Sequence, residues 1–285
     1  MRYHTIKREV SDSSALLAQD ARALSVIRQH IRLTYHTIVL AHHQIHQLSV
    51  SILTANFAVE AAYDCFDINL PKALTRVSTK RKLDFLTGRL AAKLALRAFG
   101  LAHFTVLKGM HGEPLWPDGM TGSISHTGGK TSCTAICCAY RQPSMQDCRA
   151  IGVDIEAKIN NVCFEHNVCF DRDESQHYAP LNHHAFLNHQ ETMTLVEYLC
   201  GTHPNHYIYL MIFSAKESLI KAIYAKYNVL LSFLAFEYIG VSGDVMTFTI
   251  IDGTQKAQEN GLTQTVMQVQ WGMTGQHIIT ICSIS

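Results

Sequence analysis

Hydrophobic positions recur along this chain with two periods, which together predict a mixture of helices and strands. Residues 73–100 have helical spacing, with Gly100 as a stop signal. The predicted helix carries a leucine stripe formed by Leu83, Leu86, Leu90 and Leu94. A second helix is predicted to begin near Phe213, in the apolar stretch 213-FSAKESLIK-221.

Short apolar or alternating runs predict strands in the rest of the chain. They cover residues 121–129, 133–140, 149–156, 232–240, 245–251, 265–271 and 277–283. The span 157–205 is polar and histidine-rich without clear periodicity, so we expect mobile loops there. These patterns indicate a mixed α/β protein.

The N-terminal region has a helical pattern of its own. Apolar residues spaced three and four apart predict an amphipathic surface helix over residues 15–33. His42 and His46 follow in the run 41-AHHQIHQ-47. They either share a helical face and bind a metal, or belong to a solvated histidine-rich face, and the absence of a nearby carboxylate or cysteine favours the second interpretation.

Composition narrows the class of protein. With 285 residues and 47% hydrophobic content, the chain is long enough for one large domain or two smaller ones. Its 24 basic residues balance 23 acidic ones, so no overall field favours nucleic acid or an anionic membrane. The nine cysteines include no CxxC pair, which is typical of reduced thiols. No signal peptide or membrane-spanning run is evident, and we expect a soluble, cytoplasmic protein.

Asp154 and Glu156, in the segment 151-IGVDIE-156, are two positions apart on a predicted strand. They should therefore project from the same face of it. Two adjacent carboxylates repel each other, and a hard cation is the natural partner that keeps both ionised. A solvent-facing strand end is the alternative.

Glu217 and Lys221 lie four positions apart on the second predicted helix. Such a pair is often only a surface ion pair worth roughly 0.3 to 0.5 kcal/mol. The apolar residues around it argue otherwise, because they leave little of this helix as a solvated face.

His126 lies between two hydroxyl residues and is followed by two glycines, in 121-TGSISHTGG-129. A lone histidine is usually structural, but hydroxyls, imidazole and glycine amides at one turn also suit a phosphate. Arg81, Arg89 and Lys108 would add positive charge, or each is a solubilising surface residue.

Taken together, four segments resemble the 4'-phosphopantetheinyl transferases of the Sfp and enterobactin-synthase type. The segments are 81-RKLDFLTGR-89, 108-KGMHGEPLWPDGMTGSISH-126, 151-IGVDIE-156 and 213-FSAKESLIK-221. The resemblance covers roughly residues 60 to 285. It implies transfer of the phosphopantetheine arm of coenzyme A to a serine of an apo acyl-, peptidyl- or aryl-carrier protein, with adenosine 3',5'-bisphosphate as the other product.

The resemblance also implies roles for particular residues. Asp154, Glu156 and Glu217 would be the Mg²⁺ ligands, and Lys221 would contact the phosphates, with Lys216 as a secondary contact. The remaining nucleotide and phosphate contacts would be Arg81, Arg89, Lys108, Ser125 and His126. The carrier serine needs a base, for which Glu217 and a water held by Glu156 are the candidates.

The implied fold is α/β (α+β), with two similar halves related by a pseudo-twofold axis and the site between them. We expect an N-terminal extension, partly helical, over residues 1–58, an N-terminal half over 59–150 and a C-terminal half over 151–285. Arg81-Lys82 departs from the paired arginines of many relatives, and lysine lacks the bidentate fork. A non-catalytic carrier-protein or coenzyme A binding module and a metal-dependent phosphohydrolase are the alternatives.

Overall fold

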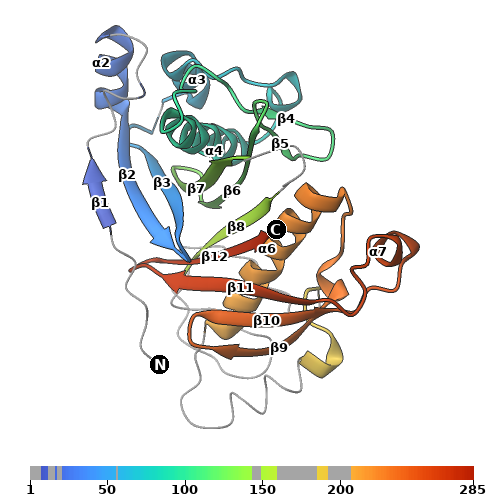
Figure 1. The fold of residues 1–285 in the computed structure, drawn as a ribbon. Helices are drawn as coiled ribbons and strands as arrows, with labels where there is room; N and C mark the ends of the chain where they lie inside the picture. Colours follow the sequence, from blue (N-terminus) through green and yellow to red (C-terminus); the bar gives the residue numbers. More distant parts are fainter. Residues whose placement is uncertain are drawn as a thin grey trace.

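A computed structural model describes residues 8–11, 17, 21–55, 57–142, 149–158, 185–191 and 207–285. These residues form two antiparallel five-stranded sheets, each carrying one long helix (Figure 1). The mixed α/β fold class predicted from the sequence is thereby confirmed.

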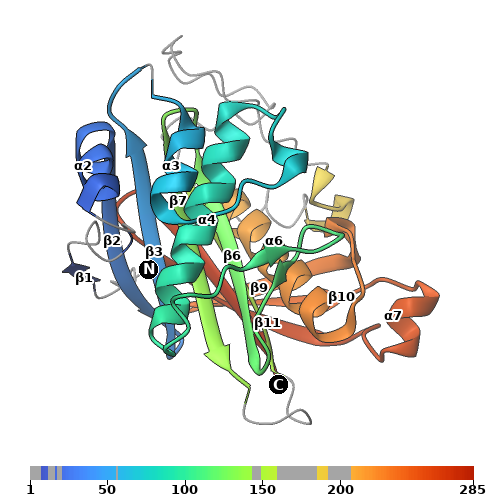
Figure 2. The same cartoon turned by 90° about the horizontal axis from the view of Figure 1, so that it is seen from above.

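The first sheet belongs to the N-terminal half of the chain. Its strands, in spatial order, are β1 (Arg8–Ser11), β2 (Ile31–Leu40), β3 (His43–Ile52), β7 (Ser132–Arg141) and β6 (Met120–Gly128). The long helix α4 (Thr79–Arg97) packs on this sheet beside the shorter α3 (Val59–Phe66), as Figure 2 shows from above. Ser78 accepts a hydrogen bond from the amide of Arg81 and caps the start of α4. A short helix α2 (Ala21–His30), a 3₁₀ turn (Lys72–Leu74) and the strand pair β4 (Leu107–Lys108) and β5 (Pro114–Leu115) complete this half.

The second sheet is built by the C-terminal half. Its strands, in spatial order, are β8 (Ala150–Ala157), β12 (His277–Ile284), β11 (Val266–Met273), β10 (Val245–Ile250) and β9 (Phe236–Ser242). Helix α6 (Ile208–Tyr227) packs on β8, β12 and β11. The short α7 (Gln255–Glu259) and a 3₁₀ turn (Phe233–Ala235) lie in the loops of this sheet. The strands predicted from residue 121 onward are confirmed.

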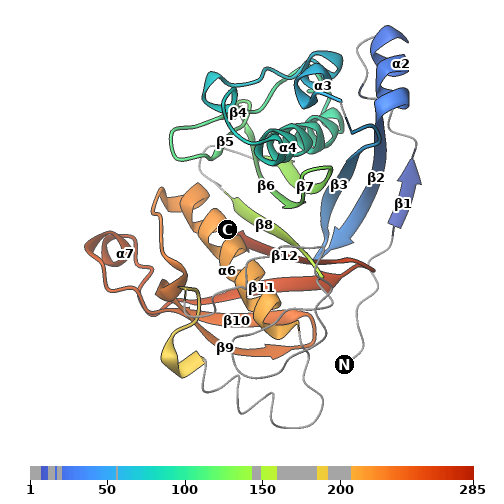
Figure 3. The same ribbon diagram turned by 180° about the vertical axis from the view of Figure 1, so that it is seen from behind.

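The two halves meet through isoleucine-rich faces. Buried residues of β2, β3 and β7, including Ile38, Ile45 and Ile136, form one core with residues of β8 and β12, including Ile151 and Ile279. Strand β6 lies beside β8 at this junction, and Figure 3 shows both strands between α4 and α6. Residues of β6, β8 and α6 are therefore neighbours, although they lie far apart in the sequence.

Two glycines permit the helices to approach their sheets closely. A Cβ atom added to Gly152 of β8 would lie 1.9 Å from the carbonyl oxygen of Ser218 in α6. A Cβ atom at Gly88 of α4 would lie 3.2 Å from the side chain of Ile124 in β6. The glycine of 151-IGVDIE-156 thus sets the distance between the strand that carries Asp154 and the helix that carries Lys221.

The N-terminal predictions need correction. The helix expected over 15–33 ends at His30, and Ile31–Leu33 begin strand β2. His42 lies in the turn before β3 and His46 lies within β3, so the two histidines share no helical face. Residues 31–40 pair with β3 at ten positions. This long-range pairing outweighs the helical spacing of residues 31–33, and β-branched residues such as Ile31 favour strands.

The first 58 residues are more than an added extension, because β1, β2 and β3 are part of the first sheet. The division into halves near residue 150 remains our proposal. Most of the span 157–205, where we expected mobile loops, lies outside the described residues. Among the residues that are described, no helix is long and apolar enough to cross a membrane.

Candidate active site

Asp154 is the centre of a polar cluster at the junction of the halves. Its carboxylate is only 3% exposed, and its Oδ1 accepts a hydrogen bond from Ser125 of β6 at 2.6 Å and another from Lys221 of α6 at 2.7 Å. Lys221 also donates to the carbonyl of Val153 at 3.1 Å and lies 3.6 Å from Glu217. One buried carboxylate thus connects both halves of the protein.

Three carboxylates, those of Asp154, Glu156 and Glu217, act on the single ammonium group of Lys221. Burial, followed by the charge of Asp154, raises the pKa of Glu156 well above its ordinary value. Burial also raises the pKa of Glu217. Burial alone would lower the pKa of Lys221, but Asp154 and Glu217 outweigh it, and the net pKa is raised. The cluster therefore has spare negative charge, which favours a further cation.

The residues present fit a magnesium ion. Oδ2 of Asp154 is buried and has no hydrogen-bond partner among the described residues. Three carboxylates offering oxygen atoms are the ligand type that Mg²⁺ prefers. Asp154 and Glu156 lie on β8 and Glu217 lies on the neighbouring helix α6, but among the described residues these three carboxylates do not each place an oxygen within 4.8 Å of the others.

His126 of β6 lies against helix α4. Its Nδ1 lies 3.8 Å from Oδ1 of Asp84, a buried residue in the interior of α4. In the described parts of the chain, only Asp84, His126 and Cys133 bring three metal-ligating atoms within 4.8 Å of one another. The sequence analysis did not single out Asp84, although an acid among the leucines of a buried helix is an unusual feature.

Lys216 does not reach this site, and the prediction that it contacts phosphate is contradicted. Its side chain is fully buried, and Nζ donates to Glu191, to the carbonyl of Phe186 and to the carbonyl of Phe236. All three ammonium protons therefore have acceptors inside the C-terminal half. Lys216 and Lys221 lie five positions apart, which on a helix separates them by roughly 140°.

Glu191, which pairs with Lys216, was missed by the sequence analysis. Its carboxylate accepts hydrogen bonds from the amides of Asn188 and Tyr238 as well as from Lys216. The side chain of Asn188 accepts from the amide of Glu191 in return, which makes a capping box. The spacing Asn-x-x-Glu in 188-NHQE-191 was the signal that the sequence offered.

The serines of 213-FSAKESLIK-221 fix helix α6 on its sheet. The hydroxyls of Ser214 and Ser218 lie 2.9 and 2.7 Å from the hydroxyl of Thr280 in β12. All three side chains are fully buried. The motif thus combines two functions on different faces, with anchoring groups toward the sheet and Glu217 and Lys221 toward the cluster.

The three basic residues predicted to hold the nucleotide lie on the N-terminal half. Arg81 is exposed in the first turn of α4, and Lys108 is exposed on β4. Arg89 is largely buried, with its guanidinium over the ring of Phe85 and donating to the carbonyl of Leu107. Burial lowers the pKa of Arg89 to about 10. Within the described residues none of the three contacts Asp154 directly.

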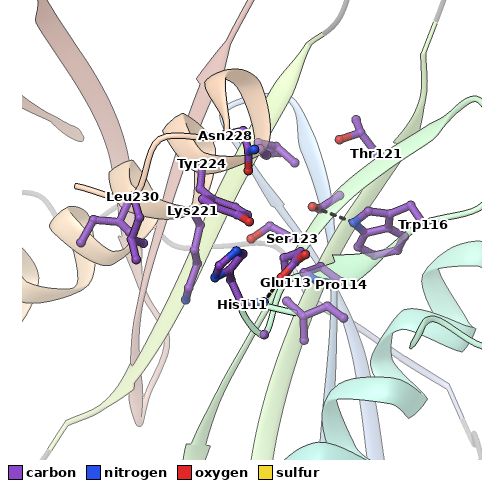
Figure 4. Close-up of a pocket in the computed structure, with 16 residues that line it drawn as sticks. His111, Glu113, Pro114, Trp116, Thr121, Ser123, Lys221, Tyr224, Asn228 and Leu230 are labelled. Carbon is purple, nitrogen blue, oxygen red and sulfur yellow. Dashed lines mark hydrogen bonds between the residues drawn. The ribbon is translucent and has the colours of Figure 1, made fainter. Parts of the chain in front are cut away.

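A cavity of about 510 Å³ opens beside Lys221 (Figure 4). Helix α6 contributes Lys221 and Tyr224 to one wall, and the 111–116 segment contributes His111 and Trp116 to the other. His111 and Tyr224 meet edge to face with ring centroids 6.0 Å apart. The cavity therefore has an aromatic, largely apolar lining that ends at the charged cluster.

The fold and the site define a mixed α/β protein with a carboxylate centre between two halves. Residues 150–282 match a family model described as the 4'-phosphopantetheinyl transferase superfamily, and residues 70–137 match one described as the 4'-phosphopantetheinyl transferase N-terminal domain. Together the two matches cover more than half of the chain. The chain belongs to the 4'-phosphopantetheinyl transferase superfamily.

Curated relatives agree with this assignment. The chain is 36% identical over 86 residues to 4'-phosphopantetheinyl transferase PptT of Mycobacterium tuberculosis, which is 29% of this chain and 34% of that protein. It is 34% identical over 126 residues to enterobactin synthase component D of Shigella flexneri, covering 44% and 53% of the two chains. Npt of Nocardia iowensis, another 4'-phosphopantetheinyl transferase, is 35% identical over 80 residues, which is 27% of this chain and 32% of that protein. The chain thus spans about a third to a half of the relatives' length.

Proposed function

We propose that this protein transfers the 4'-phosphopantetheine arm of coenzyme A to a serine of an apo acyl-, peptidyl- or aryl-carrier protein. The observation that carries the proposal is the buried Asp154, which is shared by Ser125 and Lys221 and has one oxygen without a hydrogen-bond partner among the described residues. Membership of the superfamily supplies the reaction class.

Asp154, Glu156 and Glu217 would hold Mg²⁺. When bound, the ion would neutralise charge that develops on the pyrophosphate during transfer. The raised pKa of Glu217 makes this residue a better proton acceptor than an ordinary glutamate, so it is a candidate base for the carrier serine. A water held by Glu156 is the second candidate.

Lys221 would stabilise the leaving phosphate. Its ammonium group is held on Asp154 and Glu217, and its raised pKa keeps it charged at neutral pH. Charge that is already in place when the transition state forms is the most effective kind of electrostatic stabilisation. Lys221 also lines the aromatic cavity, which fits an extended arm with apolar segments.

The N-terminal half would hold the nucleotide. His126, Ser125, Arg81, Arg89 and Lys108 are the candidate contacts for the phosphates and the adenosine, and Lys216 is removed from this set because it is buried. Arg81 lies near enough to His126 to lower the pKa of that imidazole. Their combined positive charge suits the 3'-phosphate of coenzyme A.

A non-catalytic binding module explains the site less well. A protein that only binds a carrier or coenzyme A gains nothing from three neighbouring carboxylates, which are unfavourable when buried together. A phosphohydrolase would use water in place of serine as the nucleophile. We expect no nucleic acid partner, no stable membrane insertion and a cytoplasmic location.

Intact-mass spectrometry of apo carrier proteins tests the proposal. Acyl-, peptidyl- and aryl-carrier domains are incubated with the protein, coenzyme A and Mg²⁺, and the expected result is one added phosphopantetheine arm on at least one carrier. Replacing the carrier serine with alanine should prevent the addition. Hydrolysis of coenzyme A without any carrier modification would favour the phosphohydrolase instead.

A further inference from the structure

Asp84 is a buried acid on a helix that otherwise packs into the hydrophobic core. It is 3% exposed and lies between Leu83 and Phe85. Its Oδ2 accepts a hydrogen bond from Lys80, one turn earlier in α4, at 2.8 Å. Its Oδ1 makes no close hydrogen bond among the described residues, and its nearest polar neighbours are the thiol of Cys133 and the imidazole of His126. Because a half-satisfied buried carboxylate is unfavourable, a role beyond packing is expected.

Among the described residues, the only other ion-pair partner of Asp84 is the imidazole of His126. Nδ1 of His126 lies 3.8 Å from Oδ1, the oxygen that lacks a hydrogen bond. The His126 side chain is 30% exposed, so the ring is partly accessible to solvent. A carboxylate behind one ring nitrogen fixes which nitrogen carries the proton and how the ring is oriented.

The charges that face His126 come from the two helices α4 and α6. Helix α4 contributes Lys80, Arg81 and Asp84, and α6 contributes Lys221. The nearby thiol of Cys133 in β7 stays protonated, since burial raises its pKa. Burial and the three cations lower the pKa of His126, and Asp84 is the group that opposes them.

The same surroundings argue against a metal ion at Asp84, His126 and Cys133. Lys80 already occupies one carboxylate oxygen, and two further cations act on the imidazole. A proton on Nδ1 of His126, 3.8 Å from Oδ1, places a favourable partial charge opposite Asp84 without adding a divalent ion.

We propose that Asp84 is a positioning residue for phosphate recognition: its carboxylate faces Nδ1–H of His126 and stabilises the imidazolium, so that Nε2–H donates to the 3'-phosphate of coenzyme A. This inference rests on the proposed function for the identity of the ligand. The contact between Asp84 and His126 does not depend on it. Asp84 acts through His126 and touches neither substrate nor the reacting atoms.

The tautomer of His126 tests the contact in the wild-type protein. In ¹⁵N-labelled protein above the His126 titration midpoint, NMR should show the Nδ1–H tautomer, with the signal assigned by its loss in His126→Gln. An Nε2–H tautomer would overturn the proposal without any change to Asp84.

Asp84→Asn tests the functional consequence, because it keeps the shape of the side chain and removes its charge. The His126 titration midpoint should fall by about one pH unit, which weakens coenzyme A binding roughly tenfold at pH 8 and much less at a pH below the wild-type midpoint. Binding of dephospho-coenzyme A should change less than about twofold, since it lacks the 3'-phosphate. Calorimetry with both ligands at both pH values gives the four affinities, and kcat at saturating coenzyme A should stay within about threefold.

Two further variants serve as controls. Lys80→Met removes the cation on the other oxygen of Asp84 and should raise the His126 midpoint, in the opposite direction to Asp84→Asn. In a His126→Gln background, Asp84→Asn should weaken coenzyme A binding no further, because the residue through which it acts is absent.

Several results would contradict the inference. These are an unchanged His126 midpoint in Asp84→Asn, equal losses for the two ligands, and an additive loss in the double variant. Stoichiometric zinc in the purified protein, lost in Cys133→Ser, would instead make the cluster a metal site. If no carrier is modified while the tautomer and the midpoint shift are as expected, the proposed function fails and the Asp84–His126 contact stands.

Discussion

Lys221 and Asp154, 67 positions apart in the sequence, form an ion pair with 2.7 Å between Nζ and Oδ1. Ser125 donates to the same oxygen from the N-terminal half. Three elements, β6, β8 and α6, therefore converge on a single carboxylate oxygen. The second oxygen of Asp154 keeps no hydrogen bond within the described chain, which makes it the natural ligand for a cation.

Asp154→Asn should abolish most of the transfer while preserving the fold. Asparagine still accepts a hydrogen bond from Ser125, but it removes the negative charge that pairs with Lys221 and that a metal ion would need. We expect kcat/KM to fall by about 10³-fold, measured by carrier modification. Glu259→Gln is the matched control. It should have no effect, because Glu259 is exposed and, among the described residues, its carboxylate accepts a hydrogen bond from Gln255. Near-normal turnover in Asp154→Asn would remove this residue from the metal site.

Lys221→Met should lower kcat strongly with little effect on folding. The variant loses the charge that faces the phosphates, so kcat should fall by roughly 10²-fold. Lys256→Met, an exposed lysine on the short helix α7, should leave turnover intact. Kinetics and thermal unfolding are measured on both proteins. If kcat is unchanged, Lys221 is only an ion-pair partner of Asp154.

Lys216→Met should act on stability instead of on coenzyme A binding. The variant leaves Glu191 charged and fully buried, although Asn188 and Tyr238 still donate to it. Breaking such a pair costs about 3 kcal/mol of unfolding free energy. Denaturant unfolding gives this value, and calorimetry below the unfolding transition should show an unchanged affinity for coenzyme A. A selective loss of that affinity in a fully stable variant would restore the phosphate role.

Gly152→Ala should separate helix α6 from strand β8. The added Cβ would lie 1.9 Å from the carbonyl oxygen of Ser218 and 2.7 Å from the amide nitrogen of Ala222, so backbone must move. Both the unfolding free energy and kcat should decrease, because the shift also moves Lys221 away from Asp154. Gly275→Ala is the control, since its Cβ would meet nothing within 4 Å. Equal behaviour of the two variants would show that the close approach is unimportant.

His46 should make the protein sensitive to mild acid. Tyr35 lies 2.6 Å from its Nδ1, and burial lowers the pKa of His46 to about 4. A histidine with a depressed folded-state pKa stabilises the protein fully above its unfolded pKa of about 6.5 and loses that contribution as pH falls toward 4. Between pH 7 and pH 5 the loss is about 2 kcal/mol.

His46→Gln should reduce that acid sensitivity, because glutamine does not titrate and still offers Tyr35 an acceptor. Denaturant unfolding of both proteins at pH 7 and pH 5 gives the comparison. His103→Gln, which changes an exposed histidine, should keep the wild-type pH dependence. An identical loss of stability in His46→Gln and the wild type would place the acid sensitivity elsewhere.

Local periodicity was enough to predict much of the framework. The leucine stripe identified the helix that the structure places at Thr79–Arg97, and alternating runs identified every strand from β6 onward. The spacing of Glu217 and Lys221 put both on one helical face, because four residues make about one turn. The specific order of the motifs indicated the superfamily. These features depend only on neighbours in the sequence.

Tertiary structure decided what depends on distant partners. Residues 31–33 fit a helical pattern, and only pairing with β3 makes them a strand. Lysine is a residue type that commonly binds phosphate. Only the contact with Glu191 in the folded protein shows that the side chain of Lys216 is buried. The packing of α4 on β6 places Oδ1 of Asp84 opposite His126, and only this placement indicates a role for Asp84. In each case the deciding term is burial or charge supplied by a residue far away in the chain, which no local pattern can encode.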